Sequence, residues 1–131
     1  MHLLINIDVD DLPRAEAFYR DAFGLAAARR FGDGAVEMLG AQAPLYLLRK
    51  PPGSEGAAGS PRGYHRHWTP LHLDVVVDDL DAALARALAA GARAEGDVRE
   101  AAWGRIVQLA DPFGHGWCLL QFLGPGYDEI T

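Results

Sequence analysis

The chain has 131 residues, of which 50% are hydrophobic, and a formal net charge of −6 from 18 acidic and 12 basic side chains. This size and composition predict a folded domain and exclude global disorder. The acidic balance also disfavours nucleic acid and anionic membranes, which bind to basic surfaces. The sequence shows neither a signal-peptide pattern nor an apolar run long enough to span a membrane, so we expect a cytoplasmic protein.

The first part of the chain predicts one strand, one helix and three further strands. Residues 3–9 include the period-two alternation of a half-buried strand. Asp10 and Asp11 are candidate N-caps for a helix over residues 12–23, and Gly24 is suited to end that helix. Three short strands are then expected near residues 25–31, 35–39 and 44–49.

The remainder of the chain begins with a loop and then repeats the same plan. Residues 50–68 are rich in Gly, Pro and Ser, which is typical of a loop or linker. Residues 71–77 alternate like the first strand, and Asp78 and Asp79 precede a second helix that ends before Gly91. Three strands are again expected, near residues 92–99, 105–110 and 116–122.

The clearest signal is an internal repeat, because "INIDVDDL" at residues 5–12 returns as "LDVVVDDL" at residues 73–80. Each octapeptide is the first strand and helix cap of one module, which predicts an α+β fold of two tandem βαβββ modules. Each copy is too small to bury both faces of its sheet, so we expect a curved sheet around a cleft suited to a small ligand. The expected single domain comprises module one at 1–50, a loop at 51–68, module two at 69–123 and a tail at 124–131.

Three segments carry a family resemblance: "VDDLPRAEAFYRDAFGL" (9–25), "VDDL" (77–80) and "LADPFGHGWCLLQF" (109–122). Together they resemble the vicinal oxygen chelate (VOC) superfamily, which includes glyoxalase I, bleomycin-resistance proteins and extradiol dioxygenases. The resemblance implies the two-module fold and, because such proteins pair modules within or between chains, a homodimer. It leaves the activity open, since the superfamily contains isomerases, lyases, dioxygenases and plain binding proteins.

The resemblance also implies four positions for metal ligands, at the start of the first strand and in the middle of the last strand of each module. In this chain they fall on Leu4, Tyr46, His72 and Cys118. A leucine cannot coordinate a metal and a tyrosine is a poor ligand for a divalent ion, so we expect no metal in the usual position and no resident cofactor. The alternative is a divalent metal at a shifted site, held by His72 with Asp8, Glu37 or Asp74.

Several side chains are candidates for lining the cleft. His72 and Asp74 share one strand face, where they form either an acid–base pair, with His72 as the candidate catalytic residue, or a structural hydrogen bond. Cys118 is either a nucleophile or a buried apolar side chain, and Trp68 belongs either to a lid or to an anchor for the next strand. The residues expected to line the cleft are Asn6, Asp8, Glu37, Tyr46, Trp68, His72, Asp74 and Cys118.

The favoured function is small-molecule binding without the usual complete set of metal ligands. The first alternative is a divalent-metal-dependent lyase, isomerase or dioxygenase of the glyoxalase-like kind, and the second is a metal-independent enzyme that uses His72 with Asp74 or Cys118. The acidic balance suits a cationic or neutral ligand, and a second copy of the chain is the expected protein partner. Solvated surface charge is the expected role of the basic clusters at residues 29–30, 49–50 and 62–66.

Overall fold

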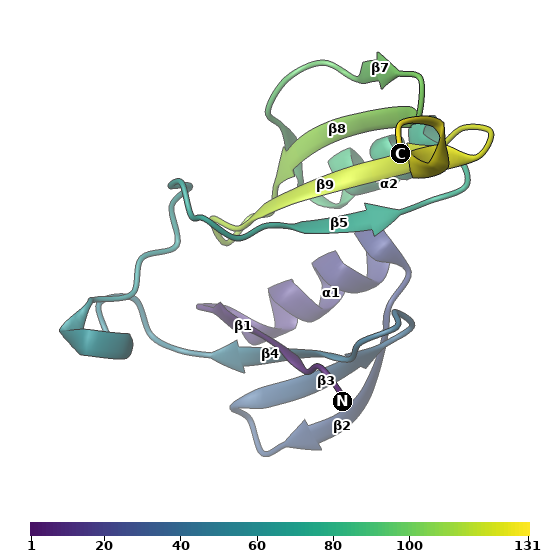
Figure 1. The fold of residues 1–131 in the computed structure, drawn as a ribbon. Coiled ribbons are helices and arrows are strands. Elements are labelled where there is room, and N and C mark those ends of the chain that lie inside the picture. Colours follow the sequence, from purple (N-terminus) through teal and green to yellow (C-terminus); the bar gives the residue numbers. More distant parts are fainter. The chain divides into compact units, whose positions relative to one another are not determined.

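The computed structural model describes all 131 residues, and the chain divides into two compact units, Met1–His65 and Arg66–Thr131 (Figure 1). Each unit contains one α-helix and one β-sheet, so the fold is α+β, as the repeat predicts. The first unit has the βαβββ order of elements, and the second has the same order with one of its strands divided. Neither helix is long and apolar enough to cross a membrane.

The first unit consists of a four-stranded sheet and helix α1 (Leu12–Phe23). Its strand order is β1-β4-β3-β2, in which β1 pairs with β4 in parallel and the other neighbours are antiparallel. The helix has the predicted bounds, and each strand lies inside its predicted range. The strands are β1 (Ile5–Val9), β2 (Ala26–Phe31), β3 (Ala35–Leu39) and β4 (Leu45–Arg49).

Local signals set both ends of α1. The Asp11 carboxylate accepts a hydrogen bond from the backbone N–H of Arg14 at 3.0 Å, which satisfies one of the unpaired donors at the helix start. Gly24 ends the helix with φ 72°, a left-handed conformation that favours glycine, and its N–H bonds to the carbonyl of Arg20. Between these ends Phe18 and Tyr19 are buried, and the helix contacts β3 and β4. One face of the sheet is therefore covered by α1.

The second unit repeats this design with helix α2 (Leu80–Ala90) and a sheet of order β5-β9-β8-β6, in which β7 also pairs with β8. The parallel pair β5 and β9 corresponds to β1 and β4 of the first unit. Asp79 caps α2 through its carboxylate, and Gly91 ends it in the left-handed conformation. The strands are β5 (Leu73–Val76), β6 (Arg93–Ala94), β7 (Arg99–Ala101), β8 (Gly104–Ala110) and β9 (Gly116–Phe122).

The prediction of one strand over residues 92–99 is wrong, because two short strands, β6 and β7, form around this segment. From Ala94 to Arg99 the chain advances five residues, while the partner strand β8 advances three, from Leu109 to Ile106. The two extra residues bulge out of the ladder. Gly96 lies in this bulge with φ 147°, a conformation that side chains with a Cβ rarely adopt.

The Gly- and Pro-rich residues 50–68 form no regular strand, as predicted, but several side chains tie them down. A single turn of 3₁₀ helix, Ala57–Gly59, lies between the bridge partners Glu55 and Pro61. Arg62 donates through Nε to the Asp8 carboxylate at 2.7 Å, and the Tyr64 hydroxyl donates to the Lys50 carbonyl at 2.7 Å. The first part of this loop is thus fastened to the first unit.

Candidate functional site

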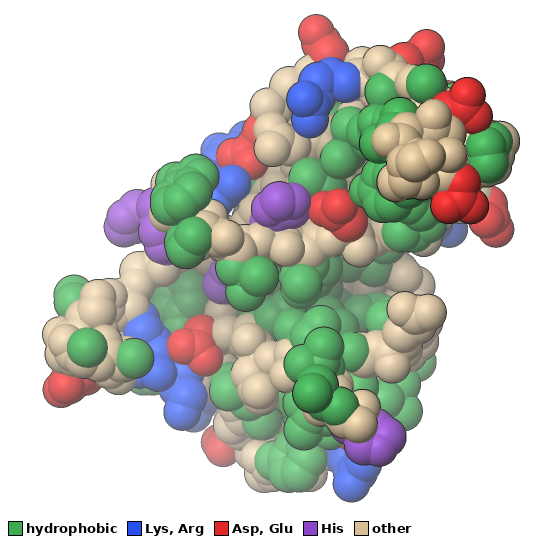
Figure 2. All heavy atoms as spheres, viewed as in Figure 1, with side chains coloured by type: hydrophobic (Ala, Val, Ile, Leu, Met, Phe, Trp, Pro, Cys, Tyr) green, Lys and Arg blue, Asp and Glu red, His purple; other side chains and the backbone are tan.

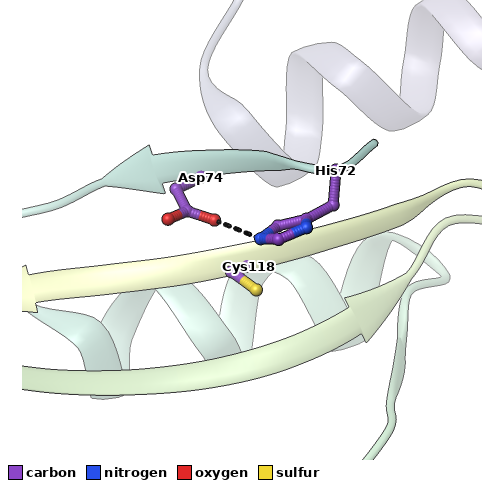
Figure 3. A group of neighbouring side chains, drawn as sticks. All are labelled: His72, Asp74 and Cys118. Atoms are coloured by element: carbon purple, nitrogen blue, oxygen red, sulfur yellow. Dashed lines mark ion pairs between the residues drawn. The ribbon is translucent and has the colours of Figure 1, made fainter. Parts of the chain in front are cut away.

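Three chemically reactive side chains lie together in the second unit: His72, Asp74 and Cys118 (Figure 3). Parallel pairing of β5 with β9 places Asp74 opposite Cys118, and His72 precedes Asp74 by two residues, so its side chain points to the same face. The imidazole Nε2 of His72 lies 3.3 Å from Oδ1 of Asp74. One nitrogen, oxygen or sulfur atom from each residue lies within 4.8 Å of the others.

Two members of this cluster, His72 and Asp74, lie on the exposed side of the segment that forms β5. His72 and Asp74 are exposed, whereas the alternating residues Leu73 and Val75 are half-buried. In the same unit α2 contacts β9, and its first residue, Leu80, is fully buried. The strand phase predicted from the sequence is therefore observed, with the polar residues of β5 away from its apolar face.

The Cys118 thiol is held in its neutral form. It is only 3% exposed, and burial raises its pKa to about 11, with the neighbouring Asp74 carboxylate as the next contribution. A neutral thiol is a weak nucleophile, so this environment disfavours Cys118 as a metal-free nucleophile. A bound metal cation would reverse the balance, because it stabilises a coordinated thiolate.

The hollow beside this cluster is small. Its volume is about 80 Å³, and its walls include His72, Cys118 and the exposed indole of Trp68. Arg66 closes one side through two bonds to the Glu95 carboxylate, at 2.9 and 3.0 Å. Sites for drug-sized ligands usually measure about 300–1,000 Å³, so this hollow suits an ion with a few coordinated groups better than a whole organic ligand.

A different polar array forms in the first unit, where Glu37 of β3 stands opposite Tyr46 of β4. The Tyr46 hydroxyl donates to Oε2 of Glu37 at 2.6 Å, and Nε of Arg29 donates to Oε1 at 3.1 Å. The hydrogen bond from Tyr46, followed by that from Arg29, lowers the pKa of Glu37, while the same carboxylate raises the pKa of Tyr46. At neutral pH the pair is therefore a carboxylate and a neutral phenol.

A pocket of about 620 Å³ opens beside this array. Arg29, Glu37 and Tyr46 supply its polar wall. Its size is in the range of small-molecule sites. The rest of the lining is mostly apolar and comes from residues 1–4, Leu39 and residues 42–44.

The other residues predicted to line the cleft, Asn6, Asp8 and Trp68, lie outside the Glu37 array. Asn6 is exposed and Asp8 is half-buried on β1, where Asp8 is engaged by Arg62. Trp68 is 80% exposed and borders the small hollow of the second unit. None of these three contributes to the Glu37 array, whose members are Arg29, Glu37 and Tyr46.

The expectation that the basic clusters are merely solvated charge is wrong for Arg29, Arg30, Arg62 and Arg66, because each binds a specific carboxylate. Arg29 lines the pocket of the first unit and is absent from the residues that the sequence predicted there. Its neighbour Arg30 forms two bonds to Glu16 instead. The turn between β2 and β3 could have signalled the Arg29–Glu37 contact, since adjacent antiparallel strands bring residues near the turn together.

Comparisons with known proteins agree with this architecture. The family model described as "Glyoxalase-like domain" matches residues 4–120. An uncharacterized protein of Mycobacterium tuberculosis (strain H37Rv) is 44% identical over 54 residues, which cover 40% of this chain and 32% of that protein. The anthracycline biosynthesis protein DauV of Streptomyces sp. (strain C5) is 27% identical over 118 residues, covering 89% of this chain and 40% of DauV. The chain thus spans well under half the length of these curated relatives.

Solved structures of similar fold cover nearly the whole chain. Lactoylglutathione lyase from Agrobacterium tumefaciens is 25% identical with a TM-score of 0.64, and the match covers 92% of each chain. TioX from Micromonospora sp. ML1 is 21% identical with a TM-score of 0.72, covering 94% of this chain and 99% of TioX. The fosfomycin resistance protein FosX from Listeria monocytogenes is 18% identical with a TM-score of 0.73, covering 100% and 98%.

Proposed function

Because the chain belongs to the glyoxalase-like domain family of the VOC superfamily, we propose that it is a small-molecule-binding protein of the glyoxalase and bleomycin-resistance type that lacks the usual complete set of metal ligands. The observation that carries this proposal is the chemistry of the first unit. There, Leu4 and Tyr46 occupy the two expected ligand positions, and both line a pocket of about 620 Å³.

Tyr46 is poorly suited to coordinate a metal in this setting. Its hydroxyl proton is already donated to Glu37 at 2.6 Å, and the adjacent carboxylate raises the pKa of the phenol. Coordination would require the phenolate, so the array opposes it. The same residues line a pocket large enough for an organic molecule, which supports binding over metal chemistry in this unit.

The names of two similar proteins support a ligand of this general kind. DauV is named for anthracycline biosynthesis, and FosX is named for fosfomycin resistance. Both names concern small organic molecules. A role of this chain in binding or sequestering such a molecule is consistent with its pocket.

Thermal-shift screening of the whole chain against a library of small organic molecules, in buffer containing EDTA, tests the proposal. A ligand present at 100 times its Kd stabilises the folded state by about 2.7 kcal/mol, which corresponds to an increase in Tm of about 10 °C for a chain of this size. Isothermal titration should then confirm a stoichiometric site. If no compound stabilises the protein, the proposed function fails.

A second candidate function, a divalent-metal-dependent lyase, isomerase or dioxygenase, is favoured by the cluster of His72, Asp74 and Cys118 in the second unit. The chemistry of these donors fits a borderline ion such as Zn²⁺, which accepts nitrogen, oxygen and sulfur ligands together. Such an ion would polarise a substrate oxygen as a Lewis acid. In the same unit the Arg66–Glu95 pair would border the ion and restrict access to it.

Titration with Co²⁺ distinguishes this candidate from the first. Binding by a thiolate should produce a strong near-ultraviolet absorption that saturates at one equivalent, and Cys118→Ser should abolish that absorption. Asp74→Asn should weaken Co²⁺ binding, while Asp78→Asn, which changes a nearby exposed carboxylate, should not. Saturation without a sulfur-dependent band would remove this candidate.

A metal-independent enzyme based on His72 receives less support from the surroundings of Cys118, because the raised pKa leaves the thiol unreactive at neutral pH. The His72–Asp74 pair itself is compatible with proton transfer. His72→Ala should abolish any metal-independent activity that is detected in the presence of EDTA. Unchanged activity in that variant would exclude His72 from the reaction.

We also propose that the chain forms a homodimer. All six residues of the edge strand β2 are exposed, including the apolar side chain of Phe31. Unpaired sheet edges and exposed apolar side chains are commonly covered by another chain. Light scattering coupled to size-exclusion chromatography should give twice the chain mass, and a monomer mass over a wide concentration range would contradict the proposal.

A further inference from the structure

We propose that the pocket of the first unit binds an amphipathic organic acid, whose carboxylate is received by Arg29 and whose apolar part lies against Leu4, Leu39 and Pro44. This inference rests on the proposed function, because it names the class of ligand for the small-molecule pocket.

The accessible charge in this pocket is positive. The Glu37 side chain is only 3% exposed, and its two oxygens already accept bonds from Arg29 and Tyr46. The Arg29 side chain is 74% exposed, and within the protein it bonds only through Nε. The two terminal nitrogens of Arg29 therefore keep their N–H groups available to a ligand.

The guanidinium is also held in a defined orientation. The bond from Nε to Glu37 fixes one edge of the planar group, and Tyr46 fixes Glu37 from the other side. The ring of Tyr46 is itself packed against Phe31, with centroids 6.0 Å apart. The terminal nitrogens form the remaining edge of the fork, which matches the two oxygens of a carboxylate in a bidentate arrangement.

The apolar lining selects an acid with a hydrocarbon body over a small inorganic anion. Leu4 is 57% exposed and Leu39 is 43% exposed, and both line the pocket together with Pro44. Hydrophobic side chains predominate around the N-terminal end of the chain in the space-filling view (Figure 2). A ligand that covers these side chains gains hydrophobic stabilisation that inorganic phosphate cannot provide.

The net charge of −6 does not prevent this mode of binding. Charges more than about 8 Å apart are largely screened at physiological ionic strength, and the nearest acidic group, Glu37, is buried with both of its oxygens already hydrogen-bonded. The local donors of Arg29, and not the net charge of the whole chain, therefore decide the charge of the ligand, which is anionic instead of cationic or neutral.

A matched set of three probes tests the proposal on the whole chain: hexanoate, hexanamide and hexylamine share one apolar tail and differ in the head group. Titration should show hexanoate binding at least about tenfold more tightly than the other two, since a charge-assisted bidentate contact exceeds a neutral one by that order. In the unmodified protein, hexanoate should also shift the NMR signal of the Arg29 side-chain Nε–Hε group.

Arg29→Met keeps a long apolar side chain but removes the guanidinium, so it should abolish the preference for hexanoate. Arg49→Met is the matched control, because Arg49 is an exposed arginine on the same sheet that lies outside the pocket, and it should keep the preference. If Arg29→Met unfolds without its bond to Glu37, the NMR shift in the unmodified protein still decides the matter.

The possible outcomes separate this inference from the proposed function. Equal affinity for the three probes, an unchanged preference in Arg29→Met or an unshifted Arg29 signal would overturn the organic-acid site, while binding of other library compounds would leave the proposed function intact. If neither the probes nor any library compound binds, both fail. Hexanoate preference that depends on Arg29 supports both.

Discussion

The ionisation of Cys118 provides a quantitative prediction about the site in the second unit. A thiol with a pKa of 9.0 is about one tenth ionised at pH 8, whereas a thiol with a pKa of about 11 is only about one thousandth ionised. Because the thiolate is the reactive form, alkylation of Cys118 by iodoacetamide at pH 8 should be about a hundredfold slower than alkylation of the same residue in a short peptide.

The rate should be measured from pH 7 to pH 12, so that the midpoint of ionisation is bracketed and is separated from simple protection by burial. A midpoint near 11 in the folded protein would agree with the surroundings of Cys118, and a midpoint at or below 9 would refute this reasoning. The peptide serves as the reference for an unperturbed thiol.

Asp74→Asn tests the cause of the raised pKa. The Asp74 carboxylate destabilises the thiolate, so its neutralisation should lower the midpoint; burial is the larger cause, so the midpoint should remain above 9. Asp78→Asn changes an exposed carboxylate that follows the same strand and should leave the midpoint unaltered. An identical midpoint in all three proteins would show that Asp74 does not act on the thiol.

The same thiol gives stability a dependence on pH with a definite sign. The folded-state pKa, about 11, is above the ordinary value of 9.0, so unfolded chains lose this proton first as the pH rises. The free energy of unfolding should therefore be unaffected by this group below about pH 9 and should fall progressively above it. Urea unfolding from pH 8 to 10.5 should show a smaller fall for Cys118→Ala, and parallel curves would contradict the assignment.

Three substitutions test the packing around the two units. Arg62→Met removes the 2.7 Å ion pair with Asp8 and should reduce the free energy of unfolding by about 0.5–1 kcal/mol. It should also make residues 50–62 easier to cleave by a protease, whereas the control Arg49→Met should not. Equal cleavage rates in the two variants would refute this role of Arg62. Gly104→Ala places a methyl group against the backbone carbonyl of Gln121 on β9 and should reduce the free energy of unfolding in urea by about 1–3 kcal/mol or more. In the control Gly34→Ala the new methyl group meets no close neighbour. A similar loss of stability in the control would argue against the steric cause. Asp111→Ala removes the carboxylate that accepts hydrogen bonds from the backbone N–H groups of Phe113 and His115 at 2.8 and 2.9 Å. It should reduce the free energy of unfolding by about 2–3 kcal/mol. A loss no larger than that of the exposed Asp128→Ala would contradict this expectation.

The elements that the sequence predicts well are those with local determinants. The bounds of α1 follow from Asp11 and Gly24, which lie within one turn of the groups they satisfy. The strand phase around Asp74 follows from the alternation of polar and apolar residues along one segment. In each case the determining contact joins residues that are close in the sequence.

The features that the sequence does not predict depend on contacts between distant residues. The division of β6 from β7 depends on the register of each against β8, although Glu95-Gly96-Asp97 offered a turn signal that could have warned of it. Arg62 reaches Asp8 across 54 residues, and no local pattern marks that pair. The pKa of Cys118 depends on Asp74, which only the pairing of β5 with β9 brings near.

The two copies of the internal repeat carry different side chains at corresponding positions. Leu4 and His72 each immediately precede the first strand of their unit, and Tyr46 and Cys118 occupy corresponding positions on the parallel partner strands. On the next strand, Glu37 stands opposite Tyr46, and Gln108 stands opposite Cys118. In the first unit Tyr46 and Glu37 orient the Arg29 guanidinium, whereas in the second His72 and Cys118 belong, with Asp74, to the cluster that could hold a metal. Since Arg29→Met and Cys118→Ser each alter only one of these sets, the two variants test the two chemistries separately.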